Sequence, residues 1–210
     1  MEPLDIFKKV KAVITDTHVV YASGKHGNAY VNKDAVYPYT KEISSLCRMI
    51  AEKFKGKAIE VVAAPTIGGV ILSQWTAHFL SEFDKRNVLA IFSEEELSPD
   101  GEKKRIFKRG YDKLIIGKKT LVVEDILTTG GSVKKVIDAA KALGADVVAC
   151  AALVNRGNVK DSDVGAPITA LVNISLDAWD EKDCPLCKAN VPLNVDVGKG
   201  REYLKNKSNL

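Results

Sequence analysis

Two adjacent acids, Glu124 and Asp125, stand just before a loop built from hydroxyl-bearing residues and glycines. The loop residues are Thr128, Thr129, Gly130, Gly131 and Ser132. Glycines let the backbone approach a phosphate closely, and successive N–H groups at a helix N-terminus favour an anion. The carboxylates upstream can accept hydrogen bonds from the two cis-hydroxyls of a ribose. This segment therefore predicts a binding site for a phosphorylated ribose.

The same residues also have a purely structural explanation. The loop can be a tight turn with a helix cap, and Asp125 can be a surface acid. The combination of an apolar run, two acids, this loop and an amphipathic helix favours the binding interpretation. The glycine patterns of dinucleotide-binding and P-loop proteins are absent, and the loop has no lysine to reach a γ-phosphate.

The elements on either side of the loop are expected to hold it at the edge of a sheet. The apolar run 120–123 predicts a buried strand that ends just before the acids, and 133–143 predicts an amphipathic helix capped by Gly144. The apolar stripe of that helix consists of Val133, Val136, Ile137, Ala140 and Leu143.

The rest of the chain alternates strands and helices in the same way. Further strands are expected at 59–64, 88–92 and 147–154, and further helices at 42–54 and 70–80. This alternation predicts an α/β protein with a parallel sheet and right-handed crossovers. In such sheets ligands bind beyond the carboxyl ends of the strands, where the turn 65–69 also lies.

Composition limits the classes of function. The chain has 210 residues, of which 46% are hydrophobic and 28% charged, and its net charge is +4. No long basic run indicates nucleic-acid binding, and no apolar stretch approaches the length of a membrane span. The first residues lack the apolar core of a secretory signal, so we expect a cytoplasmic protein that binds neither nucleic acid nor membrane.

The segment 93–110 breaks the alternation because it is polar and dense in charge. A loop of this length in a compact domain is usually a lid or disordered. Its cations are Lys103, Lys104, Arg105, Lys108 and Arg109. They can close over an anionic leaving group, although for any single one of them a solvated surface position is the simpler interpretation.

The four cysteines fall into two groups. Cys47 and Cys150 lie on apolar faces, where a free cysteine behaves as a small hydrophobe. Cys184 and Cys187 have the spacing of half a zinc site, but the chain has no second pair of this kind. We interpret them as solvent-facing residues without a role, in preference to a dithiol that stabilises the tail or a metal shared between subunits.

The segment VVEDILTTGGS resembles the phosphoribosyl-pyrophosphate (PRPP) motif of the type I phosphoribosyltransferases. The resemblance runs from about Tyr21 to Arg156 and is closest to the members that use orotate as the base. The other matching segments are Ser23-Gly24-Lys25-His26 with Tyr30, then Pro65 to Gly69, then Asn155-Arg156.

The resemblance implies a type I phosphoribosyltransferase-like fold, a central mostly parallel sheet flanked by helices with an N-terminal hood and a flexible lid loop. Residues 1–210 would form a single domain, with the hood at 1–38, the α/β core at 39–175 and a tail at 176–210. Members of this family usually bring a lysine-rich loop across from a neighbouring subunit, so a homodimer is expected.

The resemblance also implies roles for individual residues. Glu124 and Asp125 would hold the ribose hydroxyls, residues 128–132 would bind the 5′-phosphate, and Mg²⁺ would arrive largely with PRPP. Pyrophosphate would contact Thr66, Gly68 and Gly69 together with a cation of the lid, for which we name Lys103. Orotate would contact Lys25, Tyr30 and Arg156, because a guanidinium binds a carboxylate in a bidentate manner.

Three departures from the family pattern keep alternatives open. Glu94 to Glu96 stand where relatives often carry a lysine, Ile67 stands where one branch has a lysine, and Ala22 replaces a basic residue or serine. The alternatives are a transferase for another base such as a purine, and a regulator that senses PRPP without catalysis. A phosphotransfer receiver domain also places acids at strand ends but has no use for the loop 128–132.

Overall fold

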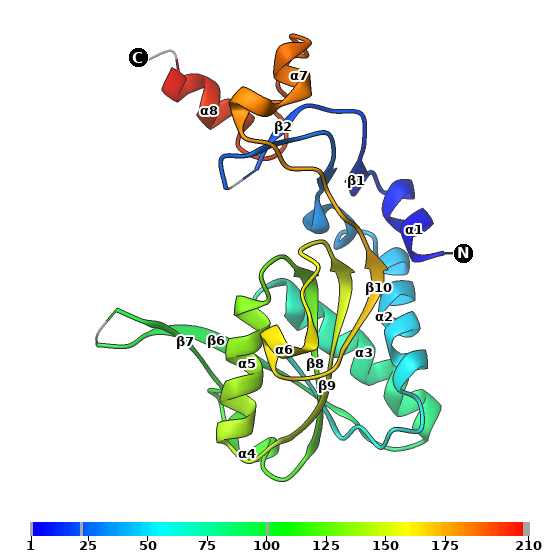
Figure 1. Ribbon diagram of the computed structural model, residues 1–210. Helices are drawn as coiled ribbons and strands as arrows, with labels where there is room; N and C mark the ends of the chain where they lie inside the picture. The colour runs from blue at the N-terminus through cyan, green and yellow to red at the C-terminus, as the bar shows by residue number, and fades with distance from the viewer. Residues whose placement is uncertain (1, 22, 100, 208–210) are drawn as a thin grey trace. The chain divides into compact units, whose positions relative to one another are not determined.

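The chain folds into two compact units. The computed structural model describes residues 2–21, 23–99 and 101–207, so Ala22 lies outside the described residues. One unit combines both ends of the chain, Met1–Val36 and Ser175–Leu210. The other unit is the continuous segment Tyr37–Ile174 and carries the predicted PRPP loop (Figure 1).

The unit Tyr37–Ile174 is built on a six-stranded sheet with the order β10-β9-β8-β5-β6-β7. Its strands are β5 (Val61–Pro65), β6 (Leu89–Leu97), β7 (Lys103–Ile106), β8 (Lys119–Leu127), β9 (Asp146–Asn155) and β10 (Ile168–Asn173). All neighbouring strands are parallel except β6 and β7, which are antiparallel. The predicted α/β class with a mostly parallel sheet is confirmed.

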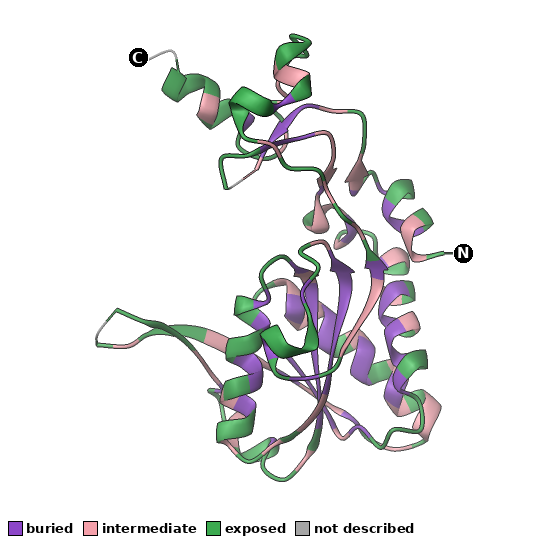
Figure 2. Ribbon diagram, in the orientation of Figure 1, coloured by how far each residue is buried: buried purple, intermediate pink, exposed green. Residues whose placement is uncertain are grey.

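Helices cover both faces of this sheet, so its central strands are buried (Figure 2), and most of their buried residues are apolar. Helices α2 (Thr40–Phe54) and α3 (Gly68–Asp84) pack together over one face, and α5 (Gly131–Ala142) packs over the other. Two short helices, α4 (Tyr111–Leu114) and α6 (Asp161–Val164), complete the unit. The stripe predicted for α5 is confirmed, with Leu143 only partly buried and the other members buried against Val122 and Cys150.

The order of the strands creates a point where the chain changes direction along the sheet. From β5 the chain runs outward to β6 and β7, and it then returns to the opposite side of β5 to form β8. The loops after β5 and β8 therefore leave the sheet side by side and in different directions. A crevice at such a switch point is where open α/β sheets bind their ligands.

The segment 93–110 is a hairpin rather than the irregular loop that was expected. Strand β6 continues to Leu97, and Glu95 stands opposite Arg105 in the antiparallel pairing with β7. Opposite charges explain the order, since the Glu95 carboxylate lies 2.8 Å from the Lys103 ammonium and the Glu96 carboxylate lies 3.0 Å from the Lys108 ammonium. The consecutive acids of β6 thus pair with bases of β7 and of the segment that follows it.

The other unit consists of short elements from both ends of the chain. From the N-terminal segment come α1 (Pro3–Lys9), β1 (Val13–Ile14), β2 (Val19–Val20), β3 (His26–Gly27), β4 (Tyr30–Val31) and the 3-10 helix η1 (Lys33–Val36). From the C-terminal segment come the 3-10 helix η2 (Glu181–Asp183), α7 (Pro185–Lys188) and α8 (Gly200–Lys207). Strand β1 pairs with β4 and β2 pairs with β3, both antiparallel. In the described ranges, no helix combines the length and apolar character needed to cross a membrane.

Candidate active site

Strand β8 is longer than the sequence predicted, and this changes the setting of the two acids. The strand was expected to end at Val123, but it continues to Leu127. Glu124 and Asp125 therefore lie within the strand, with only 7% and 4% of their surfaces exposed. Because successive side chains of a strand point to opposite faces, the two carboxylates lie on different sides of the sheet.

Asp125 lies on the side of α3, where it contacts Tyr37 and the loop after β5 approaches it closely. Its Oδ2 accepts a hydrogen bond of 2.7 Å from the Tyr37 hydroxyl. A Cβ placed on Gly68, the first residue of α3, would be only 2.4 Å from the same oxygen. A glycine at position 68 thus lets the loop after β5 approach Asp125 closely. Tyr37 has no signal in the sequence that marks it as a site residue, and it was missed.

Glu124 lies on the side of α5. Its Oε1 accepts a hydrogen bond of 3.0 Å from the backbone amide of Asp125. Burial, followed by the negative charge of Glu124, raises the pKa of the Cys150 thiol to about 12. The carboxylates of Glu124 and Asp125 therefore already accept hydrogen bonds within the protein, so a ribose would share them with these donors.

The loop after β8 has the geometry of an anion cradle. Gly130 has a φ of 76°, and a Cβ there would lie 2.7 Å from Val164 and 2.8 Å from Val159. Both the backbone conformation and the packing therefore require glycine. Among the described residues, the amides of Thr128, Thr129 and Gly130 donate no hydrogen bond. These donors precede α5 directly, where the helix dipole favours an anion.

A second loop, after β9, supports the cradle from the side. The Nε of Arg156 donates a hydrogen bond of 3.2 Å to the Thr128 hydroxyl, and its backbone amide donates to the Leu127 carbonyl. Gly157 approaches so closely that a Cβ there would lie 1.6 Å from the Thr128 carbonyl oxygen. The structure thus brings the predicted residue Arg156 to the predicted phosphate loop.

The loop after β5 carries the residues predicted to contact pyrophosphate. The Thr66 amide donates to the Ser93 carbonyl at 3.0 Å, and the Ile67 side chain is 86% exposed. A Cβ on Gly69 would lie 2.8 Å from the Ala64 Cβ, so this glycine is required by helix–strand packing. The close packing after β5 therefore leaves no room for a side chain at position 69. The large side chain of Ile67 faces solvent.

Arg105, rather than Lys103, is the hairpin cation that reaches this loop. One guanidinium nitrogen of Arg105 donates a hydrogen bond of 3.0 Å to the Thr66 hydroxyl. Lys103 instead pairs with Glu95, and its carbonyl accepts from the Lys135 ammonium. The sequence offered five cations in this segment without a way to choose, because the choice depends on which strand positions face Thr66.

Two of the predicted site residues belong to the other unit. The Lys25 ammonium lies 3.9 Å from the Asp180 carboxylate, and both groups are well exposed. Tyr30 is in β4, opposite Ile14. The predicted contact of Lys25 and Tyr30 with a base stays a prediction.

The interpretation of Cys184 as a solvent-facing residue was wrong. Its side chain is fully buried, and Cys187 is partly buried. Both sulfur atoms lie 3.6 Å from Nε2 of His18. The sequence did not reveal this arrangement because the two histidines lie near one end of the chain and the two cysteines near the other, so no local spacing links them.

Comparison with known proteins agrees with this geometry. Residues 34–184 match the family model described as the phosphoribosyl transferase domain. The chain therefore belongs to the phosphoribosyltransferase family. Its curated relatives include the orotate phosphoribosyltransferase of Caldanaerobacter subterraneus subsp. tengcongensis, which is 37% identical over 90% of this chain and 93% of the relative. The orotate phosphoribosyltransferase of Thermotoga maritima is 34% identical over 93% and 97% of the two chains.

Solved structures show the same fold at lower identity. The orotate phosphoribosyltransferase of Mycobacterium tuberculosis in complex with inorganic phosphate superposes with a TM-score of 0.62 and 19% identity, and the match covers 81% of this chain and 95% of that chain. The orotate phosphoribosyltransferase of Francisella tularensis superposes with a TM-score of 0.61 and 12% identity over 97% of both chains.

Proposed function

We propose that the protein is an orotate phosphoribosyltransferase of pyrimidine nucleotide biosynthesis. It transfers the 5-phosphoribosyl group of PRPP to orotate and forms orotidine 5′-monophosphate and pyrophosphate. Membership of the phosphoribosyltransferase family and the names of its relatives support this proposal. The single observation that carries the chemistry is the cradle of amides at Thr128 to Gly130, directly after the acids of β8.

Different residues of the site bind the two ends of PRPP. The amides of Thr128 to Gly130 and the hydroxyl of Ser132 bind the 5′-phosphate, and Glu124 and Asp125 accept from the ribose hydroxyls. The backbone of Thr66 to Gly69 binds pyrophosphate, and Arg105 reaches that loop through Thr66. Little covalent chemistry is required, because positioning and stabilisation of the charge on the leaving group supply most of the rate.

Mg²⁺ suits this site because its donors are hard oxygen atoms. The carboxylates of Glu124 and Asp125 lie just before the cradle in the sequence, and no sulfur ligand lies among the residues assigned to PRPP. Bound with PRPP, Mg²⁺ neutralises charge on the pyrophosphate. The protein's own part is to hold PRPP in place and to keep the anomeric carbon open to the base.

Arg156 is the residue that we propose recognises the carboxylate of orotate. It stands at the carboxyl end of β9 and is half-buried beside Thr128, so a base near the anomeric carbon lies within its reach. Its planar guanidinium can bind a carboxylate through two parallel hydrogen bonds. The contacts of Tyr30 and Lys25 with the base are proposed from the family resemblance. The proposal that the enzyme is a cytoplasmic homodimer rests on the family resemblance alone.

A panel of bases tests the proposal. Purified protein with PRPP and Mg²⁺ is incubated with orotate, uracil, adenine, guanine and hypoxanthine, and pyrophosphate release is measured for each. We expect release with orotate and a matching loss of orotate absorbance. Release with a purine instead would replace orotate as the substrate, and PRPP binding without release for any base would indicate a sensor.

Substitution of Arg156 tests the basis of recognition. Arg156→Lys keeps the charge but loses the two parallel hydrogen bonds, so we expect the KM for orotate to rise about 10- to 100-fold. The KM for PRPP should change much less. Arg48→Lys is the matched control, because Arg48 is an exposed arginine of α2 that pairs with Glu52. An unchanged KM for orotate would remove Arg156 from the pocket.

A further inference from the structure

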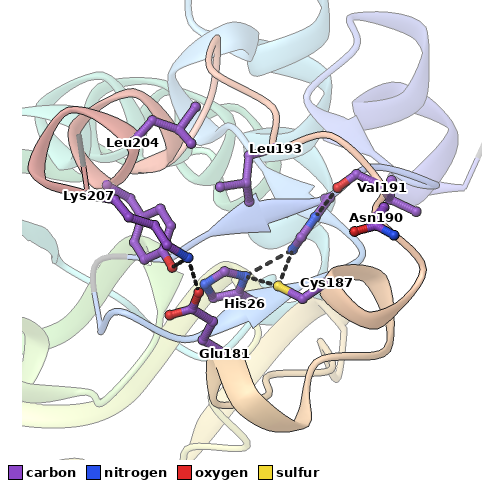
Figure 3. Close-up of a pocket in the computed structure, with 10 residues that line it drawn as sticks. His26, Glu181, Cys187, Asn190, Val191, Leu193, Leu204 and Lys207 are labelled. Carbon is purple, nitrogen blue, oxygen red and sulfur yellow. Dashed lines mark hydrogen bonds and ion pairs between the residues drawn. The ribbon is translucent and has the colours of Figure 1, made fainter.

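The unit formed by the two chain ends contains a cluster of four nitrogen and sulfur ligands that the transferase chemistry does not use. His18, His26, Cys184 and Cys187 each direct one donor atom to a common point, and these four atoms lie within 4.8 Å of one another. Figure 3 shows His26 and Cys187 side by side in this cluster. We propose that the four residues form a structural zinc site that joins the two ends of the chain.

Four of the six distances between the donor atoms are close to those of tetrahedral zinc. With Zn–N of about 2.0–2.1 Å and Zn–S of about 2.3 Å, a tetrahedral ion separates its donors by about 3.3 to 3.8 Å. The sulfur–nitrogen distances are 3.6 Å from Cys184 to His18, 3.6 Å from Cys187 to His18 and 3.3 Å from Cys187 to His26. The two ring nitrogens are 2.9 Å apart, so they need to separate by only a few tenths of an ångström.

The local fold explains how residues so distant in sequence come together. His18 precedes β2 and His26 begins β3, and the pairing of Val20 with His26 places both rings on one face of the hairpin. The C-terminal segment then aligns with each of them, since Trp179 pairs with His26 and Leu193 with His18. Between these two contacts, the N-terminal turn of α7 presents its two sulfur atoms.

Hydrogen bonding prepares His18 to act as a ligand. Its Nδ1 lies 2.7 Å from the Val191 carbonyl oxygen, which can only accept a hydrogen bond. Nδ1 must therefore carry the proton, and the lone pair of a neutral ring is on Nε2, the atom that faces the sulfurs. A histidine ligand held by a backbone carbonyl through its other nitrogen is the usual arrangement in metal sites.

The second histidine is completely buried with one ring nitrogen unpartnered among the described residues. His26 is 0% exposed, and its Nε2 has no hydrogen-bond partner among the described residues. If Nδ1 binds the metal, Nε2 carries a proton, and the Glu181 carboxylate lies beside the ring (Figure 3). The edge of the Tyr203 ring packs against His26 with the centroids 5.2 Å apart.

The donor set favours zinc over other common divalent ions. Two thiolates and two imidazoles are soft or borderline ligands, and none of the four is a carboxylate. Calcium and magnesium prefer oxygen donors, so the same site would exclude the Mg²⁺ that accompanies PRPP. Four protein ligands leave no open position for a water molecule, which is typical of a structural and not a catalytic site.

Metal content of the full-length protein is the first test. Protein purified with a reductant and without a chelator is analysed by mass spectrometry for metals, and we expect one Zn²⁺ per chain. His26→Asn and Cys187→Ser should lose most of the zinc. His78→Asn and Cys47→Ala are the matched controls and should keep it, because His78 is exposed on α3 and Cys47 is buried in α2.

Substitution with Co²⁺ gives a second test that requires no variant. We expect the intense visible bands of a tetrahedral cobalt ion and a thiolate charge-transfer band, both removed by one equivalent of added Zn²⁺. Absence of any bound Zn²⁺ or Co²⁺ in the reduced protein would overturn the proposal. A disulfide between Cys184 and Cys187 that persists in reductant, or zinc retained in both ligand variants, would overturn it as well.

The structural role has its own readout. Removal of zinc with a chelator should make residues 2–36 and 175–207 sensitive to limited proteolysis, whereas the segment 37–174 should survive as a resistant fragment. Zinc restored to the chelated protein should restore protection. If the digestion pattern is the same with and without bound zinc, the ion does not join the chain ends.

Discussion

At the scale of single residues, the candidate site depends on polar groups that the fold holds in place before any ligand arrives. Asp125 is fixed by the Tyr37 hydroxyl and lies against Gly68, while Thr128 is fixed by Arg156. Each of these contacts joins two segments that other elements separate along the chain. A ligand that bridges the loops therefore meets side chains whose rotamers are already set, which lowers the entropic cost of binding.

Neutralisation of Asp125 should impair turnover while the fold is retained. In Asp125→Asn the side chain keeps its size and can still accept from Tyr37, but it no longer offers a carboxylate to the ribose. We expect kcat/KM for PRPP to fall about 10²-fold. Asp138→Asn is the control, because Asp138 is an exposed acid of α5 that pairs with Lys134. Equal activity of both variants would contradict the assigned role.

The two glycines of the cradle should differ sharply in their tolerance of alanine. Gly130→Ala forces a positive φ on alanine and brings its Cβ against Val159 and Val164, so we expect a loss of about 1–3 kcal/mol in the free energy of unfolding and a higher KM for PRPP. Gly131→Ala is the matched control, because a Cβ there meets only the Thr129 hydroxyl at 3.5 Å. Unfolding in urea measures the loss of stability in both variants, and steady-state rates measure the KM for PRPP.

At the scale of elements, the hairpin β6–β7 shows how acids on one strand and bases on and after the other can produce an ordered strand pair. The acids at 94–96 had suggested a departure from the family, but each of them lies opposite or beside a base. Arg105 is the exception among the cations named in this segment, because it donates to Thr66 in the loop after β5. The hairpin is thereby connected to the crevice through one side chain.

Arg105→Gln should therefore affect catalysis more than other substitutions in the hairpin. Glutamine can still donate to Thr66 but carries no charge, so we expect kcat/KM to fall about 10²-fold. Lys104→Gln removes a positive charge from the adjacent exposed position and should leave the rate nearly unchanged. Steady-state rates with orotate compare the two, and a larger loss for Lys104→Gln would contradict the geometry.

The sequence predicted a helix or strand well where the spacing of its apolar residues matched a single type of element. The stripe of α5 and the apolar strands follow directly from residue type. It failed at β8, because two acids inside a buried strand oppose the ordinary pattern and hydrogen bonding from Tyr37 and a backbone amide compensates their burial. It also failed at β7, since the pairing of Glu95 with Lys103 is visible only across strands.

At the scale of the whole molecule, two buried thiols link stability to pH. Burial raises the pKa of Cys47 and of Cys150 from 9.0 to about 12. Between about pH 9 and about pH 12 both thiols keep their protons in the folded protein and lose them in the unfolded chain. The free energy of unfolding should therefore fall as the pH rises through this interval.

Cys47→Ala isolates this contribution. We expect the decline in stability between about pH 8 and about pH 10.5 to be smaller in Cys47→Ala than in the unsubstituted protein, because one of the two raised pKa values is removed. Unfolding in urea at a series of pH values gives the two curves. At lower pH the curves should run parallel, and parallel curves over the whole range would show that Cys47 does not titrate in this way.

The unit made from both chain ends has a consequence for biosynthesis. His26 emerges from the ribosome long before Cys184. The N-terminal segment of this unit therefore lacks the C-terminal segment while the residues 37–174 are translated and can already fold. During that interval two histidines and the apolar side chains beside them stay uncovered. The N-terminal segment of this unit is therefore covered only after the C-terminal segment has been synthesised.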